Sequence, residues 1–180
     1  MIVLIVGDFC VGKDTVCDNL VGMWTHNYVT NNADKPESVK ILSYATRPPR
    51  YEGENTHEFC SREEFLNFDD LVAQTKIGDE YYGTRRVQFD NNKINFYVVD
   101  GKGVIDILDS HIDDTFVVEV VRPNWLINCP QKRQDRERHF DVEYPFDYRI
   151  INDGDLNKLE RLCSECLSAI IKHYLGIDKI

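Results

Sequence analysis

Short apolar runs alternate along this chain with longer stretches whose apolar residues recur at a helical period. The run over residues 2–6 contains five consecutive apolar residues, which predicts a strand buried on both faces. Shorter runs predict further strands over 39–43, 96–99 and 116–121. The helically spaced positions are Val16, Cys17, Leu20, Val21 and Trp24, then Val104, Ile105, Ile107 and Leu108, then Leu156, Leu159, Leu162, Cys163, Cys166, Leu167, Ile170 and Ile171. This alternation predicts a three-layer α/β fold with a parallel sheet.

Between the first strand and the first helix, glycines and a lysine follow the spacing G-x-x-x-x-G-K of a phosphate-binding loop, or P-loop. Gly7 and Gly12 allow backbone N–H groups to turn inward, and the helix N-terminus behind them adds partial positive charge. Lys13 supplies a point charge for the β- and γ-phosphates of a nucleotide. The candidate nucleotide-binding residues are Gly7, Asp8, Phe9, Cys10, Val11, Gly12, Lys13, Asp14 and Thr15. The alternative is an ordinary glycine-containing turn between a strand and a helix.

One position of the loop departs from the motif. Where the motif has Ser or Thr as a ligand for Mg²⁺, this chain has Asp14, with Thr15 one residue later. A carboxylate is also a hard oxygen ligand, so the chemistry of Mg²⁺ binding is retained. Both Asp14 and Thr15 are candidate metal ligands.

Length and charge narrow the function classes. The 180 residues suit one domain, and 42% of them are apolar, enough for a core. A net charge of -10 argues against general binding of a nucleic-acid polymer, although a local arginine cluster can still bind a small anion. The sequence shows no transmembrane run and no signal peptide, so we expect a cytoplasmic protein with no membrane partner.

The six cysteines lack the spacing of a secreted disulfide framework, which agrees with reduced thiols. Cys163 and Cys166 have the spacing of a zinc or redox pair, but they fall on the apolar stripe of the last helix. No second ligand pair has matching spacing. We therefore interpret both as core residues.

Several loops are predicted from turn chemistry. Residues 27–37 are polar and contain proline, and residues 45–50 cannot be helical because two prolines push their predecessors to extended geometry. That second segment presents Arg47 and Arg50, whose guanidinium groups suit a bidentate grip on a phosphate. Taken alone, it could equally be a solvated basic loop. Residues 87–96 are interpreted as a tight hairpin around Asn91 and Asn92.

Taken together, these motifs resemble the guanylate kinase family of nucleoside monophosphate (NMP) kinases. The pieces that match in order and approximate spacing are the P-loop and residues 43–50, 53–54, 59–65, 81–84 and 146–153 with Leu156. The G-K-D-T variant of the P-loop and the strand end Val121-Arg122-Pro123 also resemble phage-type deoxynucleoside monophosphate kinases. The resemblance implies a P-loop NTPase fold with an inserted NMP-binding lobe and a lid.

Carried over residue by residue, the resemblance assigns an acceptor site. It implies that Arg47, Arg50 and Tyr82 hold the phosphate of the acceptor, that Ser43 and Thr84 touch its base, and that Asp100 lies near the acceptor and the metal. His57 stands where the family has a phosphate-binding tyrosine, and a histidine can still donate a hydrogen bond. The family's guanine-reading glutamate falls near Ala73 or Gln74, which puts the base preference in doubt.

Residues 132–138 contain four basic residues in seven, and the corresponding region of NMP kinases is the lid. Of these, Arg133, Arg136 and Arg138 are candidate catalytic residues together with Lys13, because guanidinium groups there offset charge on the transferring phosphoryl group. A solvated helix face with alternating charges is the alternative. The resulting division is a core over 1–43, 91–123 and 146–180, an NMP-binding lobe over 44–90 and a lid over 124–145.

The leading hypothesis is a kinase that transfers the γ-phosphate of ATP, with Mg²⁺, to GMP or dGMP. Two alternatives stay open. The missing glutamate allows a broader kinase of deoxynucleoside monophosphates such as dTMP. A non-catalytic guanylate-kinase-like interaction module is the other, although such modules generally lack a working P-loop. The expected partners are small nucleotides, and the oligomeric state is left open.

Overall fold

The computed structural model describes residues 1–31, 36–110, 112, 114–124 and 142–177. Five parallel strands form the main sheet in the order β2-β7-β1-β8-β9. These strands are β1 (Ile2–Val6), β2 (Ser38–Ile41), β7 (Ile94–Val98), β8 (Thr115–Val121) and β9 (Tyr148–Ile151). Every residue of β1 is buried, which confirms the prediction of a central strand covered on both faces.

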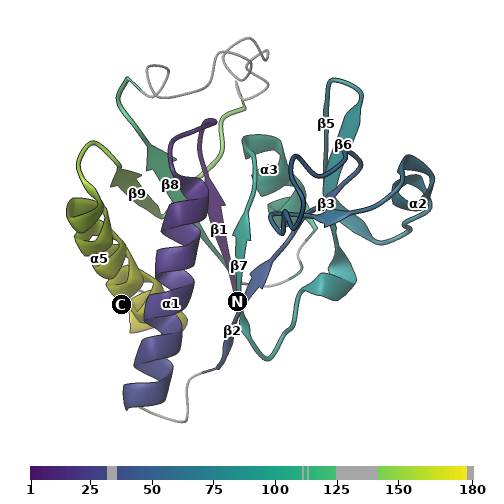
Figure 1. Ribbon diagram of the computed structural model, residues 1–180. Helices are drawn as coiled ribbons and strands as arrows, with labels where there is room; N and C mark the ends of the chain where they lie inside the picture. Colours follow the sequence, from purple (N-terminus) through teal and green to yellow (C-terminus); the bar gives the residue numbers. More distant parts are fainter. Residues whose placement is uncertain (32–35, 111, 113, 125–141, 178–180) are drawn as a thin grey trace.

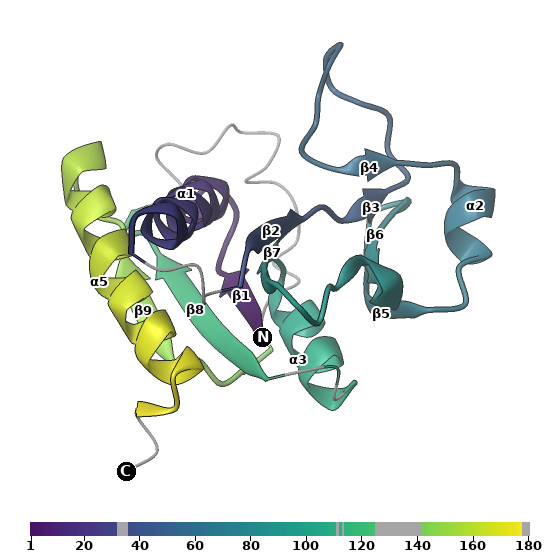
Figure 2. The ribbon, with the colours of Figure 1, turned by 90° about the horizontal axis from the view of Figure 1, so that it is seen from below.

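Helices cover the two faces of this sheet, as the predicted three-layer fold requires (Figures 1 and 2). Val3 and Ile5 face α1 (Lys13–Asn31) and α5 (Leu156–Tyr174) in one hydrophobic cluster. Ile2, Leu4 and Val6 share a second cluster with α3 (Gly101–Asp109), because successive side chains of a strand point to opposite faces. Cys163 and Cys166 are fully buried in the first cluster, which confirms them as core residues.

A second, four-stranded sheet lies between β2 and β7 in the sequence and projects to one side of the main sheet (Figure 1). Its order is β4-β3-β6-β5, formed by β3 (Tyr44–Ala45), β4 (Glu58–Phe59), β5 (Leu71–Ile77) and β6 (Glu80–Arg85). The short helix α2 (Arg62–Leu66) begins with a capping box between Ser61 and Glu64, and η1 (Arg86–Gln88) follows β6. Helix α3 packs against β5, so the main sheet and the second sheet share an interface.

Two local predictions are wrong. Residues 27–31 continue α1, where a loop over 27–37 was expected, because polar residues still form helix at the end of a well-packed segment. The hairpin over 87–96 is absent: Lys93 N–H donates to the carbonyl oxygen of Asp90 in a turn, but β7 pairs in parallel with β1 and β2. The hairpin of this region instead joins β5 and β6 around Gly78.

No helix in the described part of the chain is long and apolar enough to cross a membrane.

Candidate functional site

The P-loop connects β1 to α1 and packs against the ends of two other parallel strands. Gly7 has a φ of +152°, and a Cβ added there would lie 2.2 Å from the carbonyl oxygen of Val120 in β8. Gly12 has a φ of +100°, and a Cβ there would lie 2.7 Å from Nδ2 of Asn152, just after β9. Both positions therefore require glycine for space as well as for backbone conformation.

Asn152 also supports the P-loop, a role that the sequence analysis did not predict. Its side-chain amide is buried and donates a 2.7 Å hydrogen bond to the carbonyl oxygen of Val11. A contact between residues so distant in sequence leaves no local pattern. The amide ties the loop to the end of β9.

Lys13, the first residue of α1, reaches back over the loop. Its ammonium group donates to the carbonyl oxygens of Gly7 and Asp8 at 2.8 and 2.7 Å. Burial lowers the pKa of Lys13, and the nearby carboxylates of Asp14, Asp8 and Asp100 oppose that change. The bonded partners are neutral, so the cation is positioned without a carboxylate bonded to it.

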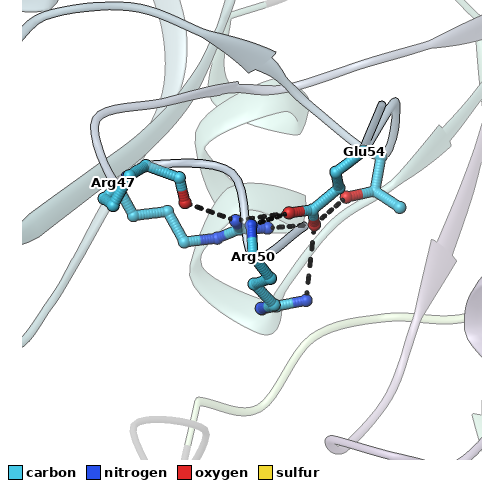
Figure 3. Close-up of polar contacts among 5 residues, drawn as sticks. Arg47, Arg50 and Glu54 are labelled. Carbon is cyan, nitrogen blue, oxygen red and sulfur yellow. Dashed lines mark hydrogen bonds and ion pairs between the residues drawn. The ribbon is translucent and has the colours of Figure 1, made fainter. Parts of the chain in front are cut away.

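On the acceptor side, an arginine–glutamate cluster (Arg47, Arg50, Glu54 and Thr56) occupies the loop between β3 and β4 (Figure 3). Arg47 donates from Nη1 and Nη2 to the two carboxylate oxygens of Glu54 at 2.9 and 2.7 Å, and Nη1 also donates to the carbonyl oxygen of Pro48. The backbone N–H of Arg50 and the hydroxyl of Thr56 donate to the same carboxylate at 2.6 and 2.7 Å. These donors hold the pKa of Glu54 well below its usual range.

The structure thus gives Glu54 a role that the sequence analysis missed. Residues 53–54 were part of the family resemblance, but no function was assigned to the glutamate. The guanidinium of Arg50 also lies 3.6 Å from its carboxylate, so two arginines share one anion. Arg47 is 7% exposed, and its buried Nε makes no hydrogen bond within the described residues.

His57 and Tyr82 lie beside this cluster, with their ring centroids 5.6 Å apart. The Nδ1 atom of His57 is buried and has no hydrogen-bond partner in the part of the chain that the structure describes. Burial lowers the pKa of His57, and the positive charges of Arg47 and Arg50 lower it further. A neutral imidazole with an unsatisfied nitrogen suits a hydrogen bond to an incoming oxygen atom.

One pocket joins the two halves of the site. Lys13 and Asp14 of the P-loop end line it together with Arg50, His57 and Tyr82 of the acceptor end. Of the predicted base contacts, Ser43 lines the pocket, whereas Thr84 is buried and does not line it. Arg47, predicted to hold the acceptor's phosphate, is also buried and is not among the lining residues. A phosphate held at each end would face the other across this pocket.

The carboxylates of Asp14 and Asp100 also line the pocket, whereas Thr15 is exposed and does not. One oxygen of Asp100 accepts the 2.7 Å N-cap hydrogen bond of Gly103, the start of α3. Among the described residues, no group of three or more His, Cys, Asp or Glu could hold a metal ion. Mg²⁺ is commonly held by one or two carboxylates together with substrate phosphates, so these two residues fit it.

The three predicted lid arginines, Arg133, Arg136 and Arg138, lie outside the described residues, as do residues 125–141 of the predicted lid. Their role stays a prediction.

Comparisons with known proteins agree with this geometry. No protein-family model matches the chain. The chain is 24% identical to the guanylate kinase of Aster yellows witches'-broom phytoplasma over 90% of its own length and 83% of the relative's, and 24% identical to that of Onion yellows phytoplasma over 90% and 82%. Its structure is similar to the crystal structure of guanylate kinase from Anaplasma phagocytophilum, with a TM-score of 0.65 and 20% identity over 94% of this chain and 85% of that one. These matches confirm the resemblance drawn from the sequence and the P-loop kinase fold.

Proposed function

We propose that this chain, a relative of the guanylate kinases in sequence and fold, is an ATP-dependent nucleoside monophosphate kinase that phosphorylates GMP or dGMP. The observation that carries the proposal is the single pocket lined by both P-loop and acceptor residues. A nucleotide switch or a plain ATPase needs the first set but has no use for Arg50, His57 and Tyr82 opposite Lys13. The two guanylate kinases matched in sequence support the same activity.

The reaction needs little covalent work from the protein. The P-loop binds the triphosphate of ATP, and Lys13 places a positive charge beside the β- and γ-phosphates. Arg50, His57 and Tyr82 bind the acceptor's phosphate, and Arg47 supports Arg50 through the Glu54 carboxylate that both contact. Holding the two phosphates face to face converts a bimolecular encounter into an oriented transfer.

Asp14 and Asp100 would hold Mg²⁺ at the pocket wall. The ion supplies charge neutralisation for the phosphate oxygens when it is bound. Closure over the pocket would exclude water, whose attack would hydrolyse ATP without product. The arginines of residues 132–138 are our candidates for that closure and for catalysis.

The base preference has a second candidate. Ala73 and Gln74, the two positions to which the resemblance assigns the guanine-reading glutamate, both line the pocket, and neither has a carboxylate. That observation favours a broader kinase that also accepts dTMP or other deoxynucleoside monophosphates.

The five cysteines that the structure describes, Cys10, Cys17, Cys60, Cys163 and Cys166, carry free thiols. We propose the cytoplasm as the compartment on that basis. The proposed partners are small nucleotides, with no membrane and no nucleic-acid polymer among them.

A coupled assay of ADP release from Mg·ATP tests the function against GMP, dGMP, dTMP, dCMP, AMP and UMP. Turnover with GMP and dGMP alone supports the leading proposal, and turnover with several bases supports the broader kinase. Binding of ATP without transfer to any acceptor contradicts both and identifies a non-catalytic module. An Asp100→Asn variant measured over a Mg²⁺ titration tests the metal assignment.

A further inference from the structure

Tyr97 is an unusual residue at the floor of the pocket. It lies on β7 beside Ile41 of β2, in a stretch that otherwise reads as apolar core. The residue is 3% exposed, and its ring packs edge-on against Phe89 with centroids 6.0 Å apart. Its hydroxyl nevertheless reaches the hydroxyl of Ser43 at 3.1 Å, and the side chain contributes to the pocket lining. The hydroxyl of this buried tyrosine therefore lies where a core strand meets the binding site.

Two further hydroxyls, from separate elements, surround it. Ser43 follows β2, and Thr84 belongs to β6 of the second sheet. Burial raises the pKa of Tyr97, and hydrogen bonding with the hydroxyl of Ser43 opposes that rise. The Thr84 hydroxyl is completely buried and makes no hydrogen bond within the described residues. Thr84 does not line the pocket, whereas Ser43 and Tyr97 both do, so these two hydroxyls are the ones available to a ligand.

The stretch of wall formed by Ala73 and Gly103 has no polar side-chain atom, and Gln74 and Thr75 line the pocket beside it. Ala73 and Gly103 both line the pocket, and the point where a Gly103 Cβ would stand is 3.5 Å from the Ala73 Cβ. A Cβ on Gly103 would also come within 2.3 Å of Val99, so the wall is closed to larger residues there.

We propose that the Tyr97 hydroxyl is a base-reading group of the acceptor site and acts with the hydroxyl of Ser43. The inference rests on the proposed function, because it requires a nucleoside monophosphate in the pocket. A hydroxyl can donate or accept, whereas a carboxylate only accepts. The two hydroxyls therefore bind bases with a carbonyl edge, such as guanine or thymine, without demanding guanine's row of donors. The acceptor class is a monophosphate of an oxo base.

The test compares Tyr97→Phe with the matched control Tyr81→Phe. Tyr81 lies on β6, and its hydroxyl bonds Arg62 at 3.3 Å away from the pocket. Calorimetric titration measures the Kd of GMP and that of ribose 5-phosphate, which carries the phosphate but no base. We expect Tyr97→Phe to raise the Kd of GMP by about 3- to 10-fold, the range of one neutral hydrogen bond, and to leave that of ribose 5-phosphate unchanged.

Tyr81→Phe is expected to change neither constant. Equal weakening of GMP and ribose 5-phosphate in Tyr97→Phe would reveal a purely structural role and overturn the inference, as would an unchanged Kd for GMP. Ser43→Ala, which removes the hydroxyl that Tyr97 contacts, provides a second variant with the same expected split between the two ligands. A wild-type protein that binds no monophosphate contradicts the proposed function itself, an outcome distinct from normal binding that is insensitive to Tyr97.

Discussion

The two ends of the pocket hold their cations in different ways. Lys13 is bonded to two backbone carbonyl oxygens of its own loop, whereas Arg47 is bonded to the carboxylate of Glu54. Neutral partners position the lysine and leave its charge for the triphosphate. At the acceptor end, the carboxylate of Glu54 offsets one of the two guanidinium charges. The remaining positive charge matches the phosphate of a nucleoside monophosphate, which is a smaller anion than a triphosphate. A cation is thus positioned before the substrate arrives by backbone carbonyl oxygens at the tight loop and by a shared carboxylate in the longer acceptor loop.

The largest expected effect is at the loop end. Lys13→Ala should lower kcat/KM by about 10²–10³-fold, because it removes a preorganised positive charge from the transferring phosphate. The coupled ADP assay with GMP measures this change. Lys172→Ala, an exposed lysine in the last turn of α5, is the matched control and should retain full activity. Turnover by Lys13→Ala at the wild-type rate would contradict the P-loop assignment.

At the acceptor end, replacing the two arginines should have different effects on stability. Arg50→Ala should raise the KM for GMP by about 10- to 100-fold, the range of a charge-assisted hydrogen bond, with little change in Tm, since Arg50 lines the pocket and is exposed. Arg47→Ala should raise KM and also lower Tm, because it leaves the Glu54 carboxylate without its bidentate partner. Steady-state kinetics and thermal melts measure both, with exposed Arg86→Ala as control. If Arg50→Ala lowers Tm as much as Arg47→Ala, the distinction is wrong.

The Glu54 carboxylate should make the acceptor loop sensitive to acid. Its pKa is depressed below the ordinary value of 4.5, so its contribution to stability is present above pH 4.5 and is lost as pH falls further. Glu54→Gln should melt lower than wild type at pH 7, and the gap should narrow in acid. Thermal melts from pH 7 to pH 3 show this, with Glu63→Gln on α2 as an exposed control. A constant gap across that range contradicts the assignment.

The smallest expected effect concerns His57. Its pKa is depressed below the ordinary 6.5 by burial and by Arg47 and Arg50, so the folded protein binds a proton less readily than the unfolded chain. Stability should therefore fall as pH drops through 6.5 and level off below the depressed pKa. His57→Gln should reduce the change in Tm between pH 7 and pH 5.5 by a few degrees. If Tm changes with pH by the same amount in wild type and in His57→Gln, then His57 does not titrate between pH 7 and pH 5.5.

The P-loop and the main sheet were predictable from local sequence. The strand over 2–6 is buried on both faces, and Gly7 and Gly12 both require glycine for space as well as conformation. Each of these features depends on residues close together in the chain, where hydrophobic period and motif spacing carry the information. The failed hairpin over 87–96 shows the limit, since the turn at 90–93 was visible but the parallel partners of β7 were not.

By itself, the sequence determined a P-loop on an α/β sheet and, through resemblance, the arginines of an acceptor site. Only the tertiary structure decided how those arginines are held and what lies on the pocket floor. Glu54 acts through two guanidinium groups, Asn152 through the backbone of Val11, and Tyr97 through a hydroxyl outside its own strand. Such side chains look ordinary in sequence, because their role depends on neighbours that folding brings together and on burial that strengthens each polar contact.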